Sequence, residues 1–268
     1  MKYLTIFILI FSISACSVTV KEDMIASPSK DINSQNLKTL SKVYSTVELT
    51  AKDGSKLFAL QKYNSDIKTT LVVFHGNALN LTLQPWFGVL NTLSELNINI
   101  LAIDYRGYGE SEGKASFTHM KEDAQSTLNI VSSDQNVYVY GLSLGSVMAA
   151  EVMTDKRVKG VIIEGGITNQ NEMIDLFKSK KTFGSLFNVE LDKSLNFDIP
   201  KSIQSHQIPL LVIHGNQDDN IPVSMGETIF TASNHSNSRL FLVDNGGHCD
   251  TFAVDKDEYL ERLNTFIN

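Results

Sequence analysis

The chain of 268 residues contains only two cysteines, Cys16 and Cys249, and no stretch dense in lysine and arginine. Two cysteines can form at most one disulfide. The formal net charge is −7, and no basic stripe overrides it. A nucleic acid is therefore not an expected partner.

Motifs that bind metals and cofactors are missing as well. No spacing of Cys, His and Asp is typical of a metal site, and there is neither a Gly-rich phosphate loop nor a dinucleotide fingerprint. Apolar residues make up 42% of the chain and charged residues 20%, as expected for a globular protein with a substantial core. We therefore predict a folded protein that uses neither a metal nor a cofactor.

No apolar run is long enough to span a bilayer comfortably. Residues 3–13 form an almost unbroken apolar run with the length of a signal-peptide core. Residues 13–16, I-S-A-C, resemble a bacterial lipobox, whose cysteine becomes the lipidated first residue of the mature protein. The resemblance implies a lipoprotein signal peptide over residues 1–15 and a membrane anchor on Cys16. If Cys16 is lipidated, Cys249 has no partner and no structural disulfide can form. An ordinary secretory peptide and an uncleaved anchor are the alternatives.

Two further expectations concern this N-terminal part. Ser17 directly after the cysteine resembles lipoproteins of the outer membrane, so the expected location is the bacterial cell envelope, at the outer membrane facing the periplasm. Residues 16–42 are rich in Ser, Lys, Asp and Asn and show little apolar periodicity. We expect them to form a tether between the membrane and a single domain over residues 43–268.

Strand-like and helix-like segments alternate along the rest of the chain. Asp53-Gly54 separates two strand-like runs, residues 46–50 and 56–63, which is a hairpin signal. Six more apolar runs predict buried strands: residues 71–74, 98–103, 137–140, 161–163, 210–213 and 240–243. Amphipathic patterns predict helices between them: residues 85–96, 117–131, 146–154, 224–232 and 255–267. This order predicts an α/β fold, with a mostly parallel eight-stranded sheet flanked by helices.

The pentapeptide G-L-S-L-G at residues 141–145 carries the strongest chemical signal. A β-favouring run precedes it and a helix-tolerant run follows it. Strand, G-x-S-x-G and helix are the context of a nucleophile elbow, in which a tight turn lifts the serine hydroxyl off the end of a sheet. Ser143 is therefore the candidate nucleophile, and a structural Gly-rich turn is the alternative.

A serine hydroxyl needs a base, and the base needs an acid that orients it. Among the six histidines, His248 follows Gly246-Gly247 in the loop between the last strand and the last helix, where an imidazole can reach over the sheet edge. Asp218 lies just beyond the strand at residues 210–213, and its neighbour Asp219 competes for the role of the acid. The chain order Ser143, Asp, His248 is the order of one fold specifically.

Acyl transfer also requires donors for the developing oxyanion. The backbone N–H of Leu144, directly after the nucleophile, is one candidate. The second is expected from the loop after the strand at residues 71–74, and we assign it to Asn77, with Ala78 as the alternative if the turn is wound differently.

These motifs together resemble the α/β-hydrolase superfamily from about Thr46 to the end of the chain. They are H-G-N-A at residues 75–78, the G-x-S-x-G pentapeptide, H-G-x-x-D-x-x-I-P at residues 214–222 and G-G-H at residues 246–248. The run at residues 104–113, D-Y-R-G-Y-G-E-S-E-G, resembles the Bem46-like serine hydrolases, relatives of protein depalmitoylases and lysophospholipases. The family pattern selects Asp218 as the acid. In that run Asp104 and Arg106 are expected to form a structural pair.

The resemblance implies a cofactor-free serine hydrolase that cleaves a carboxylic ester or thioester of a small molecule, a lipid or an acylated protein. Residues 165–207 are expected to form a minimal cap whose apolar face receives an acyl chain, with an ordinary packing helix as the alternative. The apolar residues of this segment are Met173, Ile174, Leu176, Phe177, Phe183, Leu186 and Phe187. A serine peptidase and a non-catalytic envelope lipoprotein that uses the fold for binding are the rival functions. A dehalogenase or epoxide hydrolase is excluded, because either needs an aspartate at position 143. The oligomeric state is not predicted.

Overall fold

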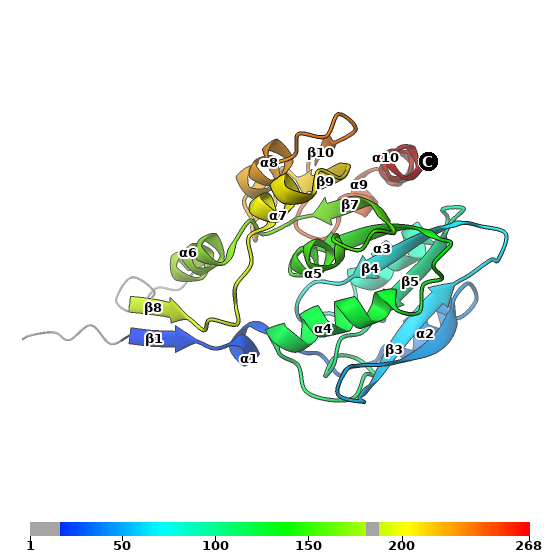
Figure 1. Ribbon diagram of the computed structural model, residues 1–268, viewed down its shortest axis with the longest axis horizontal. Helices are drawn as coiled ribbons and strands as arrows, with labels where there is room; N and C mark the ends of the chain where they lie inside the picture. The colour runs from blue at the N-terminus through cyan, green and yellow to red at the C-terminus, as the bar shows by residue number, and fades with distance from the viewer. Residues whose placement is uncertain (1–16, 181–187) are drawn as a thin grey trace, which may run out of the picture.

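An eight-stranded sheet forms the centre of the protein (Figure 1). The structure is a computed structural model and describes residues 17–180 and 188–268. The strands are β2 (Ser45–Thr50), β3 (Lys56–Lys62), β4 (Thr69–Phe74), β5 (Asn99–Ile103), β6 (Asn136–Leu142), β7 (Val158–Glu164), β9 (Leu210–Gly215) and β10 (Arg239–Val243). Their order in the sheet is β10-β9-β7-β6-β4-β5-β3-β2. Only the pairs β2–β3 and β3–β5 are antiparallel. The prediction of a mostly parallel sheet is confirmed.

Helices cover both faces of this sheet (Figure 1). On one face lie α4 (Phe117–Leu128), α5 (Gly145–Val152), α7 (Ile199–His206) and α8 (Val223–Thr231), which contact one another in that order. On the other face lie α2 (Ser34–Leu40), α3 (Trp86–Leu93), α9 (Thr251–Val254) and α10 (Lys256–Ile267). The five helices expected from the apolar patterns all form, each within three residues of the predicted ends.

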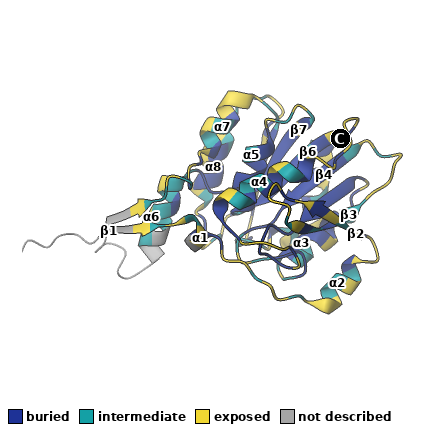
Figure 2. Cartoon of the chain, turned by 60° about the horizontal axis from the view of Figure 1, so that its bottom comes forward, coloured by how far each residue is buried: buried dark blue, intermediate teal, exposed yellow. Residues whose placement is uncertain are grey.

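The central strands are buried on both sides, as Figure 2 shows in dark blue. Along β4, Leu71 and Val73 belong to the core cluster shared with α3 and α10, whereas Val72 and Phe74 belong to the cluster shared with α4 and α5. Successive side chains of a strand point to opposite faces, so a continuous apolar run fills two cores at once. This double burial holds the carboxyl ends of the strands, where the site lies, on a rigid support.

The segment expected to be a tether is packed onto the domain instead. It contains β1 (Ser17–Val20), α1 (Glu22–Ile25) and α2. Ile25 and Leu40 are buried in the two core clusters, and Asn33 accepts a hydrogen bond that caps α2. The tether prediction is therefore wrong for residues 25–40, because Ile25, Ala26 and Leu40 are buried in the core of the domain. The predicted signal peptide and Cys16 lie outside the described residues.

The remaining elements belong to the segment expected to be a cap. It contains α6 (Gln170–Lys180) and β8 (Asn188–Leu191), followed by α7. β8 pairs in parallel with β1, and the two strands project together from the body of the domain (Figure 1). Phe183, Leu186 and Phe187, which the sequence assigns to the apolar face of the cap, lie outside the described residues. Within the described part of the chain, no helix is both long and apolar enough to cross a membrane.

Candidate active site

The turn between β6 and α5 has the geometry of a nucleophile elbow. Ser143 has a φ of 53°, in the left-handed region that a non-glycine residue rarely adopts. The backbone passes so closely here that a Cβ on Gly145 would stand 2.2 Å from the carbonyl oxygen of Phe74, and one on Gly141 would stand 2.2 Å from the carbonyl oxygen of Gly145. The Ser143 N–H donates to the carbonyl of Glu164 at 2.9 Å, which holds the strained turn against β7.

The loop after β10 brings His248 to the same edge of the sheet. His248 Nδ1 lies 2.7 Å from Asp218 Oδ2. Asp218 also accepts hydrogen bonds from the backbone N–H groups of Asn220 and Ile221, both at 2.8 Å, which fix its other carboxylate oxygen. Burial raises the pKa of Asp218, but hydrogen bonds from His214 and His248 outweigh it and hold this pKa well below its usual value. The acid is therefore ionised and oriented at neutral pH.

The choice between Asp218 and Asp219 follows from this geometry. The Asp218 side chain is fully buried, whereas Asp219 is exposed to solvent. A second histidine also contacts the acid, because His214 Nε2 lies 3.3 Å from Asp218 Oδ2 and 3.0 Å from the carbonyl of Ile221. In the sequence, His214 follows an apolar run and precedes Gly215, which indicates only a turn at the end of a strand. Its contact with the acid depends on how the loop at residues 215–221 folds back, which sequence spacing does not reveal.

The two expected oxyanion donors face the same cavity. Asn77 and Leu144 both line the pocket that contains Ser143 and His248. Among the hydrogen bonds of the described residues, neither the N–H of Asn77 nor that of Leu144 has a protein acceptor. Two unpaired N–H groups beside a serine hydroxyl are what a developing oxyanion requires. Ala78, the alternative, has a φ of 57° at the turn and does not line the pocket.

The pocket at this site has a volume of about 280 Å³ and mainly apolar walls. The apolar side chains come from Ile25, Leu144, Ile167, Met173, Leu176 and Ile221. Met173 and Leu176 belong to α6, so the segment expected to be a cap does contribute to the site. Ile25 comes from the segment expected to be a tether, and no sequence signal marks it.

Glu164, at the end of β7, is a buried carboxylate beneath the elbow. It accepts hydrogen bonds from Tyr140 at 2.6 Å, from Tyr259 at 2.8 Å and from Thr251. Burial raises the pKa of Glu164, against the three hydroxyl donors that lower it. Thr251 follows His248 by three residues, so this network ties the loop that carries His248 to the strand that supports Ser143.

Asp104 and Arg106, from the run at residues 104–113, have structural roles, but they do not pair with each other. Arg106 is almost fully buried and binds three carboxylates, at 2.7 Å to Asp123, 2.8 Å to Glu122 and 2.9 Å to Asp53. Asp104 instead accepts a hydrogen bond from the N–H of Leu81 and lies away from Arg106. The expected pair is therefore wrong, because Arg106 reaches α4 whereas Asp104 faces the loop after β4.

Cys249 is an unreactive neighbour of the site. Burial raises the pKa of its thiol to about 12, and the carboxylates of Glu164 and Asp218 act in the same direction. A thiolate nucleophile would need a lowered pKa. In the described residues, no group of three or more His, Cys, Asp or Glu side chains is arranged to hold a metal ion.

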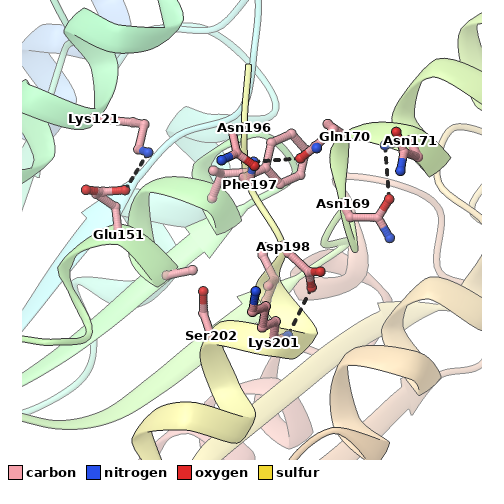
Figure 3. Close-up of a pocket in the computed structure, with 13 residues that line it drawn as sticks. Lys121, Glu151, Asn169, Gln170, Asn171, Asn196, Phe197, Asp198, Lys201 and Ser202 are labelled. Carbon is pink, nitrogen blue, oxygen red and sulfur yellow. Dashed lines mark hydrogen bonds and ion pairs between the residues drawn. The ribbon is translucent and has the colours of Figure 1, made fainter. Parts of the chain in front are cut away.

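A second and larger pocket lies beside α5, away from the candidate nucleophile (Figure 3). Its volume is about 450 Å³, and most of the lining side chains labelled in Figure 3 carry an amide or a charged group. Lys121 pairs with Glu151 at 2.8 Å, and the side chain of Asp198 caps α7 by accepting from the N–H of Lys201. Ser143, Asp218 and His248 do not line this pocket.

Comparison with known proteins agrees with this geometry. Residues 65–194 match the family described as serine aminopeptidase, S33. Human alpha/beta hydrolase domain-containing protein 17B is 30% identical over 206 residues, which cover 75% of this chain and 67% of that protein. The chain belongs to the α/β-hydrolase family.

Two further proteins extend this similarity. Protein bem46 of Schizosaccharomyces pombe is 28% identical over 224 residues, 79% of this chain and 73% of that protein, so the resemblance to Bem46-like proteins is confirmed. The esterase Pf2001 of Pyrococcus furiosus has the same fold, with a TM-score of 0.72 and 20% sequence identity over 90% of this chain and 98% of its own. Family and fold together support a hydrolase.

Proposed function

We propose that the protein is a serine hydrolase that cleaves carboxylic ester or thioester bonds through an acyl-enzyme on Ser143. One observation carries the proposal: the hydrogen-bonded pair of His248 and Asp218 opens on the same apolar pocket as a strained serine and two unpaired backbone N–H groups. Nucleophile, base, acid and oxyanion donors are the complete set of parts for acyl transfer.

The hydrogen bond between His248 Nδ1 and Asp218 leaves Nε2 as the nitrogen that takes the hydroxyl proton. Ser143 Oγ then bonds to the carbonyl carbon, and the negative charge on the carbonyl oxygen is met by the N–H groups of Asn77 and Leu144. When the intermediate collapses, the alcohol or thiol leaves with the proton from His248. A water, deprotonated by His248, next attacks the acyl group and releases a carboxylic acid, and the proton returns to Ser143.

The walls of the pocket support an acyl group as the recognised part of the substrate. A volume of about 280 Å³ lies at the small end of the range for ligand sites, which favours a short or medium acyl chain. A small ester, a lipid or an acylated protein can each present such a chain. We further propose that Cys16 carries a lipid anchor and holds the protein at the bacterial envelope, facing the periplasm. Multiple acyl chains would anchor it firmly, because a single chain binds only marginally.

A serine peptidase is the second candidate, since the matching family is described by an aminopeptidase. An aminopeptidase must bind the positively charged amino terminus of its substrate. None of the described residues that line the pocket is Asp or Glu, so no carboxylate of the described part offers itself to an ammonium group. The ester or thioester substrate is favoured for this reason.

The test is the hydrolysis of p-nitrophenyl esters from acetate to palmitate by the full chain, beside the variant Ser143→Ala. The proposal expects at least a thousandfold loss of kcat in the variant with an unchanged circular dichroism spectrum. A fluorophosphonate probe should label the wild type and not the variant. Esterase activity retained by Ser143→Ala would refute the mechanism. Failure of the wild type to take the probe would favour a binding protein, and turnover of an aminoacyl p-nitroanilide but of no ester would favour the peptidase.

A further inference from the structure

The N-terminal residues 17–33, which we call the N-terminal strap, run across the edge of the sheet that holds the candidate site. At its start, β1 pairs with β8 of the cap segment over four residues. At α1, the carboxylate of Glu22 accepts from the N–H of Thr118 at 2.9 Å. Further along, the carbonyl of Ser29 accepts from the N–H of Gly109 at 2.8 Å, and the N–H of Asn33 donates to Thr82 at 3.0 Å. The strap therefore connects the cap segment with the loop after β4.

Between these attachments, the strap holds the side chain of Asn77. The amide nitrogen of Asn77 donates to the carbonyl of Ile25 at 2.6 Å, and the N–H of Ser27 donates to Asn77 Oδ1 at 2.8 Å. Tyr108 donates to the same oxygen at 2.8 Å. All these bonds act on the side chain, and the backbone N–H of Asn77 has no acceptor among the hydrogen bonds of the described residues. A side chain held at both ends restricts the rotation of its own peptide group.

The same part of the strap forms a wall of the pocket. Ile25 is only 4% exposed and lines the cavity together with Ser143 and His248. Met173 and Leu176 of α6 line the same pocket, so the strap and the cap segment each contribute apolar side chains to its wall. An apolar side chain at this place contacts the part of an acyl chain that extends beyond the reacting carbonyl.

We propose that the N-terminal strap is a working part of the active site: Ile25 is a specificity-determining residue for the acyl chain, and the backbone of Ile25 and Ser27 positions the oxyanion donor Asn77. This inference rests on the proposed ester hydrolysis. The strap would act in two separate ways. The side chain of Ile25 contacts the bound acyl chain, whereas the hydrogen bonds to Asn77 affect the transition state. Binding of the chain appears in KM, and oxyanion stabilisation appears in kcat.

The hold on Asn77 can be tested with a matched pair of substitutions in the full chain. Ser27→Pro removes the N–H that donates to Asn77, and Ser27→Ala keeps it while removing the hydroxyl. Ser27 is exposed, and Ala26 has a ψ of 111°, which is the conformation required before a proline. We expect Ser27→Pro to lower kcat about three- to tenfold for every ester with KM within twofold, and Ser27→Ala to match the wild type. Equal kcat values for the two variants would overturn the positioning role.

The role of Ile25 in acyl-chain specificity is tested with the variant Ile25→Ala and the same p-nitrophenyl esters. We expect kcat/KM for the octanoate ester, relative to the acetate ester, to fall about fivefold, because the truncated side chain loses contact with the longer chain only. Leu40→Ala is the control, since it removes an equally buried side chain from α2 that does not line the pocket. It should lower the Tm and leave the ratio of the two esters unchanged. An unchanged ratio in Ile25→Ala would overturn the specificity role.

The variant Ser143→Ala separates this inference from the proposed function. If it is inactive while the Ser27 and Ile25 variants match the wild type, the strap inference fails and the serine mechanism stands. If Ser143→Ala retains esterase activity, the serine mechanism fails and the strap inference fails with it.

Discussion

His75 and Asp104 form a buried pair whose two members should give opposite pH dependences of stability. Both side chains are fully buried, and His75 Nε2 lies 3.6 Å from Asp104 Oδ1. Burial lowers the pKa of His75 from 6.5 to about 4 and raises the pKa of Asp104 from 3.8 to about 7. His75 Nδ1 lies 2.7 Å from the carbonyl of Gly76, so this nitrogen carries the proton and Nε2 is unprotonated. At 3.6 Å the two side chains are not hydrogen-bonded, and His75 Nε2 and Asp104 Oδ2 have no hydrogen-bond partner among the described residues, so both side chains are buried in their neutral forms at mildly acidic pH.

The direction in which each pKa is shifted decides how that residue's contribution to the free energy of unfolding changes with pH. The folded-state pKa of His75 is depressed, so its contribution is present above pH 6.5 and is lost as the pH falls towards 4, by about 3 kcal/mol. The folded-state pKa of Asp104 is raised, so its contribution is present below pH 3.8 and is lost as the pH rises towards 7, by about 4 kcal/mol. Between pH 4 and 6.5 the two contributions oppose each other and largely cancel in the wild type.

Replacing either residue should therefore reveal the pH dependence that the other one gives to the free energy of unfolding. In Asp104→Asn, the free energy of unfolding relative to the wild type should rise with pH between 4 and 7, by about 4 kcal/mol, because the opposing contribution of Asp104 has gone. In His75→Asn, which keeps a donor for the carbonyl of Gly76, the same difference should fall between pH 4 and 6.5, by about 3 kcal/mol.

The assay is urea unfolding of the three proteins at half-unit steps from pH 4 to 7.5, followed by fluorescence and circular dichroism. The difference between variant and wild type cancels the groups that both proteins share, and the m-value shows whether the unfolding remains two-state. The reasoning is refuted if the two difference curves are flat or slope in the same direction. A cavity left by the shorter side chain would shift a curve at every pH without changing its slope.

Three further predictions concern the acid, the elbow and the buried arginine. Asp218→Asn should lower kcat by about 10³- to 10⁴-fold with little change in KM, because His248 loses the partner that orients it; a loss below tenfold in steady-state kinetics would remove Asp218 from the mechanism. Gly145→Ala should abolish activity and lower the Tm, since its Cβ would stand 2.2 Å from the backbone oxygen of Phe74; an active, equally stable variant would contradict the close packing of the elbow. Arg106→Met should cost about 3–5 kcal/mol in urea unfolding, because it leaves three carboxylates without their partner; a cost below 1 kcal/mol would show that the network contributes nothing net.

Much of the central fold is visible in the sequence, because its signals are local. The apolar runs that become β4 to β7 are buried on both faces, so they contain hardly any polar residue that would obscure the pattern. The elbow is equally local, since a strand, five residues and a helix are contiguous. The prediction failed where the signal is sparse. Among the residues of the range 17–42 whose side chains the structure describes, the buried hydrophobic ones are Ile25, Ala26 and Leu40, too few and too widely spaced to form a readable period.

The features that the sequence did not predict depend on contacts between segments that lie far apart in the chain. Tyr140, Glu164 and Tyr259 meet in one network although they lie on three elements far apart in the sequence, and each alone is an ordinary residue at a strand end or in a helix. Asp104 and Arg106 stand two positions apart in a strand-end turn, which made a pair plausible, yet their side chains enter different layers.

The sequence by itself determined the class of fold and indicated the candidates for the nucleophile, the base and the oxyanion donors, because each signal lies in residues that adjoin one another in the chain. The resemblance already selected Asp218 over Asp219, and the structure shows its contact with His248. Tertiary structure alone decided that His214 contacts the acid and that an N-terminal segment lines the pocket and holds Asn77. The physical reason is the same in each case. These contacts depend on which side chains are buried when distant segments pack together, and the local sequence pattern does not specify that packing.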